Sequence, residues 1–327
     1  MTDSLTHQVK PPALFLMGPT ASGKTELAAL IAQRWPVEVI SVDSALIYRD
    51  MNIGTAKPDA EFLQRLPHFM IDIRNPDQPF SVAEFRRAVL PIMSAIVERG
   101  NVPLLVGGTM LYFKILLEGI ADIPAADPDI RRSILAEAEQ KGWQTMHEKL
   151  RLVDPLTASR LHPNHSQRIQ RALEVYQLTG ETLSELQSRQ SFESLPFRIK
   201  QFALWPADRA QLHLRISERF EQMLEQGFID EVIGLRQKYN LHADLPSMRA
   251  VGYRQVWDFL EQTIDSDTLL AKGVVATRQL AKRQLTWLRK WDELEYLELD
   301  YSKKSGKVER FGSLIDKIAA SLIELGL

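Results

Sequence analysis

Four short apolar stretches, several of them rich in β-branched residues, recur along the chain and predict buried strands. They cover residues 13–17 (ALFLM), 37–42 (VEVISV), 102–106 (VPLLV) and 199–205 (IKQFALW). Helical patterns lie between them, for example at 25–34 and 81–98. Continuously apolar strands that alternate with helices are typical of a parallel sheet covered on both faces. The pattern therefore predicts an α/β fold.

The stretch from about Ile120 to Arg198 has a different pattern, which opens with the proline-marked segment IPAADPD and contains no convincing strand. Helical patterns follow at 129–141, 144–150, 166–178 and 182–190, and Gly180 is well placed to end the third. We predict an all-helical insertion domain at 120–198 within a discontinuous core domain of 1–119 and 199–327. After Trp205 the pattern is mostly helical to about Trp291.

Composition narrows the possible functions. The chain of 327 residues contains no cysteine, which excludes disulfides, thiolate metal sites and cysteine nucleophiles. The formal net charge is −2, so any binding of nucleic acid must use local basic patches. The first twelve residues, expected to be a loose lead-in, lack the pattern of a signal peptide, and the apolar run after them is too short to span a membrane. The predicted location is the cytoplasm.

Residues 18–25 read GPTASGKT, which is the pattern G-x-x-x-x-G-K-T between a predicted strand and a predicted helix. Glycines let successive backbone N–H groups point inward around an anion, and the start of the helix adds its positive dipole end. Lysine supplies an ammonium group, and the threonine hydroxyl suits Mg²⁺. The predicted phosphate site consists of Gly18, Pro19, Thr20, Ala21, Ser22, Gly23, Lys24 and Thr25, with Thr25 as the candidate metal ligand.

Nucleoside triphosphates are the usual ligands of such a P-loop, so ATP binding by a kinase or ATPase is the default alternative. Those enzymes usually place an acid after a second apolar strand, but the stretch 102–106 is followed by Gly107-Gly108-Thr109. The acid instead follows 37–42, as Asp43. At that position it should lie on the same edge of the sheet as the P-loop, as a metal ligand, a general base or only a local cap.

Several further stretches resemble the bacterial tRNA dimethylallyltransferases, also called tRNA isopentenyltransferases. They are LMGPTASGKT, ISVDSALIYR, MNIGTAKP, LLVGGTMLYFK, QRIQRALEVY, RISERF, RAVGYRQ and TRQLAKRQLTWLRK, and they run from the P-loop to about Trp291. In the stretch MNIGTAKP, Asn52 stands where the family pattern has an acidic residue. The eukaryotic members carry an additional zinc finger, so the absence of cysteine fits a bacterial form.

The resemblance implies a P-loop NTPase-like fold and an alkyl transfer that uses Mg²⁺. The N6 amine of the adenosine next to the anticodon on its 3′ side would attack C1 of dimethylallyl diphosphate, in tRNAs that read codons beginning with U. Asp43 would be the general base, and Lys24 and Arg219 would hold the diphosphate, with Arg215 a weaker candidate. Thr109 would contact the tRNA close to the reacting base.

The same resemblance implies a surface for the tRNA anticodon stem-loop. Arg278, Lys282 and Arg289 fall on one face of a predicted helix, with Arg283 further round, while Leu280 and Trp287 on the other side look like core. The full predicted set is Asp43, Ser44, Ala45, Leu46, Thr109, Arg131, Gln167, Arg168, Arg171, Arg249, Gly252, Tyr253, Arg254, Arg278, Lys282, Arg283 and Arg289.

Three other functions remain open at this stage. A P-loop kinase of small molecules would account for the P-loop and Asp43 but not for the basic helix. A non-catalytic RNA-binding protein gated by a nucleotide would account for the basic clusters and would not need Asp43. An enzyme that prenylates free adenine nucleotides would not need the long helical insertion. Nothing in the sequence demands a partner chain, and a monomer is expected.

Overall fold

The computed structural model describes residues 10–121, 123–189, 195–301, 307–324 and 326. Contacts divide the chain into two compact units, Met1–Leu116 with Leu195–Leu327, and Leu117–Ser194. Residues 1–9 of the expected lead-in lie outside the described residues, as does Gln190 at the end of one predicted helix. No helix among the described residues is long and apolar enough to cross a membrane.

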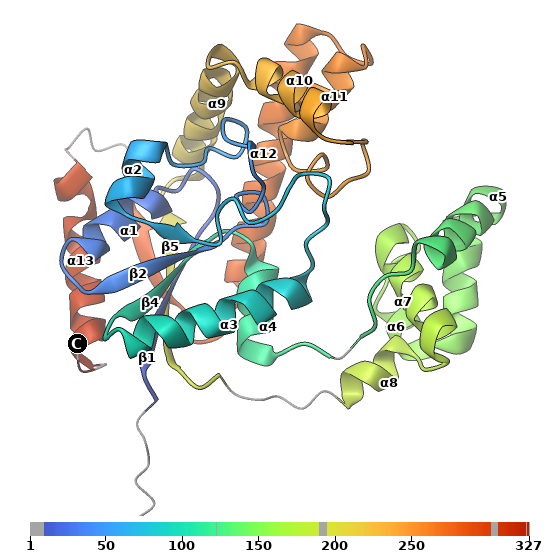
Figure 1. Cartoon of the computed structure of the whole chain (residues 1–327), viewed down its shortest axis with the longest axis horizontal. Coiled ribbons are helices and arrows are strands. Elements are labelled where there is room, and N and C mark those ends of the chain that lie inside the picture. The colour runs from blue at the N-terminus through green and yellow to red at the C-terminus, as the bar shows by residue number, and fades with distance from the viewer. Residues whose placement is uncertain (1–9, 122, 190–194, 302–306, 325, 327) are drawn as a thin grey trace, which may run out of the picture. The chain divides into compact units, whose positions relative to one another are not determined.

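The larger unit is built on a parallel sheet of six strands in the order β3-β2-β4-β1-β5-β6 (Figure 1). The α/β prediction is confirmed, and so are the four predicted strands. The strands are β1 (Pro12–Met17), β2 (Val37–Val42), β3 (His68–Phe69), β4 (Val102–Gly107), β5 (Arg198–Pro206) and β6 (Glu295–Leu299).

Two strands, β3 and β6, were not predicted from the sequence, and each was missed for a physical reason. β6 lies at one edge of the sheet, and its side chains alternate between exposed and buried, as in Tyr296 and Leu297. A search for continuously apolar runs finds only strands that are buried on both faces. β3 lies at the other edge and is too short to give a periodic signal.

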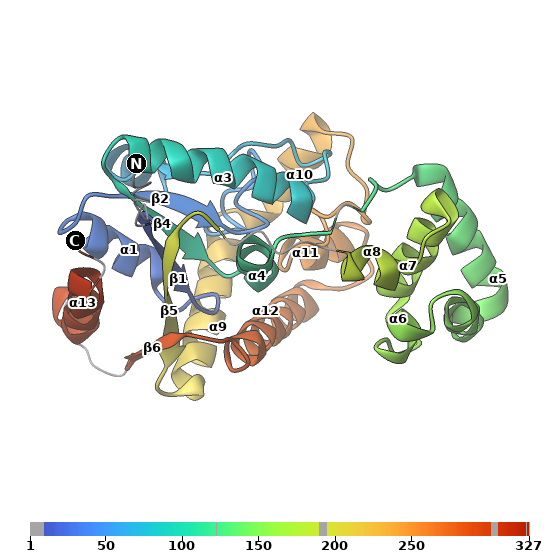
Figure 2. The same ribbon diagram turned by 90° about the horizontal axis from the view of Figure 1, so that it is seen from below.

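Helices cover both faces of this sheet. α1 (Lys24–Ala32) and α13 (Lys307–Glu324) lie side by side on one face, where Leu27 and Phe311 join a core cluster with Leu14 and Leu16 of β1. On the other face are α3 (Val82–Glu98) and α4 (Met110–Glu118), as Figure 2 shows. There the Phe113 ring packs 5.0 Å from that of Phe15 in β1.

A second core lies beyond the carboxyl edge of the sheet. It is formed by α9 (Arg209–Glu225), α10 (Phe228–Lys238), α11 (Tyr253–Leu260) and α12 (Ser266–Leu288), together with residues 47–56 of the chain after β2. Phe220 and Tyr253 both pack edge-on against Phe228 at its centre. Packing in this core holds α9 to α12 in place beyond the strand ends. The remaining helix of the larger unit is the short α2 (Ala60–Arg65).

The smaller unit contains α5 (Pro128–Val153), α6 (Pro155–Ser159), α7 (Ser166–Thr179) and α8 (Leu183–Ser188), and no strand among its described residues. α5 bends at Gly142, whose φ is 78°, where the sequence pattern predicted a gap between two helices. Gly180 ends α7 in the left-handed conformation, as predicted. Buried Asp154 caps α6 and also accepts the backbone N–H of Ser184 in α8.

Candidate active site

The P-loop connects β1 to α1 and forms a turn that depends on glycine. Gly23 precedes the helix with a φ of 90°, a conformation that side chains disfavour, and Ala21 also has a positive φ of 61°. A non-glycine residue in this region is locally strained, and such strain gathers at ligand sites. Buried Ser22 has a hydroxyl with no hydrogen-bond partner among the described residues. The loop therefore has the shape and an unused polar group expected of an anion site.

Lys24 holds the loop in shape through hydrogen bonds to its backbone. Its ammonium donates to the carbonyl oxygens of Gly18 at 3.0 Å and Pro19 at 2.6 Å. Burial lowers the pKa of Lys24 to about 8, an effect that the nearby Asp43 carboxylate partly offsets and the Arg219 guanidinium reinforces. Arg219 lies on α9, and burial also lowers its pKa, again with an opposing effect of Asp43. The three charged groups predicted for the site therefore act on one another.

Asp43 follows β2 directly and starts a tight turn. Its Oδ1 accepts the backbone N–H groups of Ala45 at 2.8 Å and Leu46 at 3.3 Å. Among the residues that the structure describes, no hydrogen bond to Oδ2 is recorded, and the side chain is half-buried. The local-cap interpretation is thus correct for Oδ1, while Oδ2 has no hydrogen-bond partner recorded among the described residues.

Thr109 links the Asp43 turn to the end of β4. Its Oγ1 accepts the backbone N–H of Ser44 at 3.0 Å and donates to the Ser44 hydroxyl at 3.3 Å. The hydroxyl therefore binds across to the turn, while α4 begins at the next residue. Together Lys24, Arg219, Asp43 and Thr109 combine a cationic anion site with a carboxylate beside it.

Arg215, which shares the α9 face with Arg219, has a different environment. Its Nε donates to the carbonyl oxygen of Ala21 at 3.0 Å, and its guanidinium lies 4.8 Å from the centre of the Tyr301 ring. Arg215 therefore supports the strained residue of the P-loop from outside, which agrees with its weaker standing as a diphosphate ligand.

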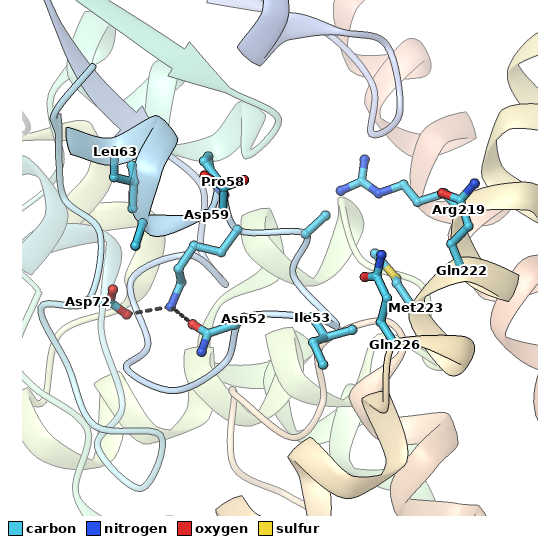
Figure 3. Close-up of a pocket in the computed structure, with 13 residues that line it drawn as sticks. Asn52, Ile53, Pro58, Asp59, Leu63, Asp72, Arg219, Gln222, Met223 and Gln226 are labelled. Carbon is cyan, nitrogen blue, oxygen red and sulfur yellow. Dashed lines mark hydrogen bonds and ion pairs between the residues drawn. The ribbon is translucent and has the colours of Figure 1, made fainter. Parts of the chain in front are cut away.

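A cavity of about 650 Å³ lies between α9 and the chain that follows β2 (Figure 3). Arg219 and Gln222 of α9 line it, with Gln226 just after the helix, opposite Pro58 and Asp59. Its volume falls within the range of about 300–1,000 Å³ that is usual for small-molecule sites. The P-loop itself does not line it, so Arg219 is the residue shared between the cavity and the P-loop charges.

Two charged residues that the sequence analysis missed hold the cavity wall. Lys57 donates to the Tyr48 carbonyl, to Asn52 Oδ1 and to Asp72. Glu231 of α10 accepts the backbone N–H groups of residues 52–54 and the hydroxyl of Tyr253. A lone charge, in a loop for Lys57 and on a helix for Glu231, gives no signal of this role in the sequence.

Beyond the Asp43 turn and Thr109, the residues predicted to bind tRNA fall into three groups in the structure. In the larger unit Arg249 and Arg254 are exposed, whereas Gly252 and Tyr253 are buried, so Tyr253 supports the loop at 52–54 and presents no surface of its own. On α12 and its end Lys282, Arg283 and Arg289 are exposed. Arg278 is half-buried, and its Nε finds no partner among the described residues.

Trp287 was expected to be core, and that prediction is wrong. Its side chain is 37% exposed, and the Lys114 ammonium lies 5.8 Å from the centre of its ring. Helical spacing places Trp287 opposite the basic residues, but that direction alone does not bury the side chain. Arg289 lies over the ring of Trp205, 5.7 Å from its centre.

The third group lies in the smaller unit and surrounds a buried acid. Glu174 is fully buried, and its carboxylate binds Arg131 at 3.0 Å and Arg171 at 2.8 Å. It also accepts the backbone N–H of Asp127. These contacts hold two guanidinium groups in fixed positions while part of each stays exposed. Gln167 and Arg168 are exposed on the same helix, α7.

A parallel sheet with a P-loop after its first strand, and with a carboxylate next to the loop's lysine, defines a P-loop enzyme that handles a phosphorylated small molecule. The model of the family described as IPP transferase matches residues 46–291. The chain belongs to that family, and it is therefore a transferase. The match covers three quarters of the chain. It begins at Leu46, so Asp43 lies just before the matched range.

Solved structures agree with this assignment. The tRNA isopentenylpyrophosphate transferase of Bacillus halodurans is 35% identical, with a TM-score of 0.70 over 97% of this chain and 98% of that one. The tRNA delta(2)-isopentenylpyrophosphate transferase of Staphylococcus epidermidis is 33% identical, with a TM-score of 0.66 over 96% and 99%. A eukaryotic dimethylallyltransferase acting on tRNA is 25% identical, with a TM-score of 0.79 over 96% and 80%.

Membership of the family is consistent with a divalent metal. No group of three or more histidine or acidic side chains suited to a metal occurs among the described residues. Thr25 is exposed in the first turn of α1, at the end of the P-loop. A single hydroxyl fits an ion that is held mostly by substrate phosphate oxygens and water, as Mg²⁺ usually is.

Proposed function

We propose that the protein transfers a dimethylallyl group from dimethylallyl diphosphate to N6 of the adenosine on the 3′ side of the anticodon in tRNA. The observation that carries the proposal is the open carboxylate oxygen of Asp43 beside Lys24 and Arg219. The family and the tRNA enzymes that the chain resembles support the choice of substrates. They do not favour a kinase.

The proposed reaction needs little covalent help from the protein. The bond between C1 and the diphosphate oxygen breaks as the bond from N6 to C1 forms, and the diphosphate leaves with the bonding pair. The P-loop amides, Lys24 and Arg219 bind the leaving group, because they place positive charge where negative charge develops. Asp43 accepts the proton that N6 loses, which also directs the amine toward C1.

Mg²⁺ is the ion that we propose for the site, with Thr25 as its protein ligand. When bound, it would neutralise part of the charge of the diphosphate. The exposed cations of α12, residues 249 and 254, and the arginines held by Glu174 are proposed to bind the anticodon stem-loop. We also propose that residues 120–198 form the insertion domain that contacts the tRNA and that the enzyme is a monomer.

The first experiment is a transfer assay with Mg²⁺, labelled dimethylallyl diphosphate and a tRNA that has adenosine 3′ of its anticodon. Label should appear in the tRNA, at that adenosine. Parallel reactions would offer AMP as acceptor, or labelled ATP with no prenyl donor. Label in AMP but not in tRNA, or phosphate transfer from ATP alone, would contradict the proposal.

The basic residues on α12 lead to a prediction about salt. Changing Lys282, Arg283 and Arg289 to alanine should weaken tRNA binding and make it less sensitive to salt. Each lost phosphate contact reduces the magnitude of the slope of log K against log salt by about 0.7–0.9, so the triple variant should lose about 2–3 units of slope. Binding titrations at several salt concentrations measure this slope. Lys317→Ala, an exposed change on α13, serves as control, and an unchanged slope in the triple variant would exclude phosphate contacts.

The lowered pKa of Lys24 predicts a pH dependence of substrate binding. Below about pH 8 Lys24 of the free enzyme is a charged ammonium, and above that pH it is a neutral amine. Above about pH 8, binding of a diphosphate therefore requires Lys24 to take up a proton. Affinity for an unreactive prenyl diphosphate analogue should therefore fall above about pH 8, by at most about tenfold for each pH unit. Lys24→Arg keeps its charge across this range. The ratio of the two affinities, measured by calorimetry, should change near pH 8 and would be flat if Lys24 took no part.

A further inference from the structure

A buried glutamine, Gln284 of α12, connects two loops of the active site. Its Oε1 accepts the backbone N–H of Thr20 in the P-loop at 2.8 Å, and its Nε2 donates to the carbonyl oxygen of Gly108 at 2.9 Å. The side chain is 8% exposed; its bond to Gly108 is buried and its bond to Thr20 partly buried. Both ends of one amide group are thus used, one on each side of the site.

The close approach of Gln284 accounts for the glycine at position 108. A Cβ there would lie 2.4 Å from Nε2 of Gln284, which is far closer than side-chain atoms approach. Gly108 precedes Thr109, whose hydroxyl binds the backbone of Ser44 in the Asp43 turn. The contact therefore continues from the P-loop through Gln284 to the loop that positions Asp43.

The hydrogen bond to Thr20 also changes what the P-loop offers to a ligand. An N–H that Gln284 already binds is not available to a phosphate oxygen, so the remaining amides and Lys24 define where the diphosphate lies. If the glutamine were apolar, the Thr20 N–H and the Gly108 carbonyl would each lose a partner. Unpaired polar groups of the backbone are costly when they are buried, and the loops would move to satisfy them.

We propose that Gln284 is a positioning residue that sets the diphosphate loop and the acceptor loop relative to each other, and that it couples tRNA docking to diphosphate binding. The coupling follows from its place on α12. Lys282 and Arg283 are exposed on the same helix, so a polyanion that docks on them acts on the element that holds both loops. The inference rests on the proposed function for the identity of the polyanion as tRNA.

Two measurements test this proposal, with Gln284→Leu as the variant. Its kcat/KM for dimethylallyl diphosphate should fall by about 10–100-fold, as expected when reacting groups are misplaced, while its Kd for tRNA stays the same. The matched control is Gln279→Leu, the same change at an exposed position of the same helix, which should leave both values unchanged. Equal kcat/KM in Gln284→Leu and wild type would overturn the positioning role.

The coupling is measured with inorganic diphosphate alone, so that it does not depend on turnover. In the wild type an anticodon stem-loop should tighten diphosphate binding, and diphosphate should tighten binding of the stem-loop by the same factor. In Gln284→Leu that factor should approach one. A factor unchanged from the wild type would overturn the coupling, whereas absence of prenyl transfer by the wild type would instead overturn the proposed function.

Gln284→Glu separates positioning from a loss of folding. The glutamate can still accept the Thr20 N–H but cannot donate to Gly108. A folded variant with its melting temperature close to the wild type should therefore show an intermediate kcat/KM. If Gln284→Leu unfolds, the glutamate variant alone decides: kcat/KM equal to the wild type, at an equal melting temperature, would refute the two-sided contact.

Discussion

Replacing Asp43 by asparagine is expected to lower kcat by about 10²–10⁴-fold, the usual contribution of a general base. The amide oxygen of asparagine can still accept the N–H groups of Ala45 and Leu46, so the turn should persist. What the variant loses is the carboxylate that we propose takes the N6 proton. Single-turnover transfer to tRNA, with both substrates saturating, measures the chemical step directly.

The control for this prediction is Asp244→Asn, which removes an exposed acid from a loop of the same unit. Affinity for tRNA should be nearly the same in both variants and in the wild type. If Asp43→Asn lost tRNA binding in proportion to turnover, the role of general base would be wrong. Asp43 would then be a binding residue only.

Replacing Lys24 by methionine is expected to produce the second large effect, on the diphosphate. A charge-assisted hydrogen bond contributes about 1.5–3 kcal/mol, so the affinity for an unreactive prenyl diphosphate analogue should fall by about 10–150-fold. Because the ammonium also stabilises the departing charge, kcat should fall as well, by about 10²–10³-fold. Isothermal calorimetry and single-turnover kinetics measure the two effects separately.

Loss of Lys24 also leaves the carbonyl oxygens of Gly18 and Pro19 without their partner, so the loop could change shape. Arg219→Gln provides the comparison, because no hydrogen bond to the P-loop is recorded for Arg219 among the described residues. It should weaken analogue binding in the same direction without any change in the loop. Unaltered analogue affinity in both variants would mean that the diphosphate binds elsewhere.

The sequence carried the larger features of the fold because they depend on strong local patterns. The P-loop, the four inner strands and the end of α7 at Gly180 follow from residue type and spacing alone. Edge strands such as β6 do not, because half of their side chains face solvent. Trp287 shows a related limit. Helical spacing gives the direction in which its side chain points, but it does not say whether protein or solvent lies on that side.

The candidate site divides in a similar way. Asp43 could be placed near Lys24 because parallel strands bring their carboxyl ends to one edge of the sheet. Gln284 could not be found, since its partners are backbone atoms 264 and 176 residues away in the chain. Glu174 was missed for a related reason: a glutamate on a basic helix resembles a solvated charge until its complete burial is seen.

The contacts that hold residues 52–54 in the cavity wall determine which of these positions can accept other residues. Glu231 binds this segment through the backbone N–H groups of residues 52–54, so it places no demand on the side chain at position 52. Asn52 offers Lys57 an amide oxygen, and an aspartate there would offer a carboxylate oxygen in the same place. Because Asp72 already neutralises Lys57, the asparagine loses no ion pair. Gly54 has no such freedom, since a Cβ would lie 2.1 Å from the Phe228 ring. A saturation library of this segment should therefore tolerate many residues at 52 and almost none at 54.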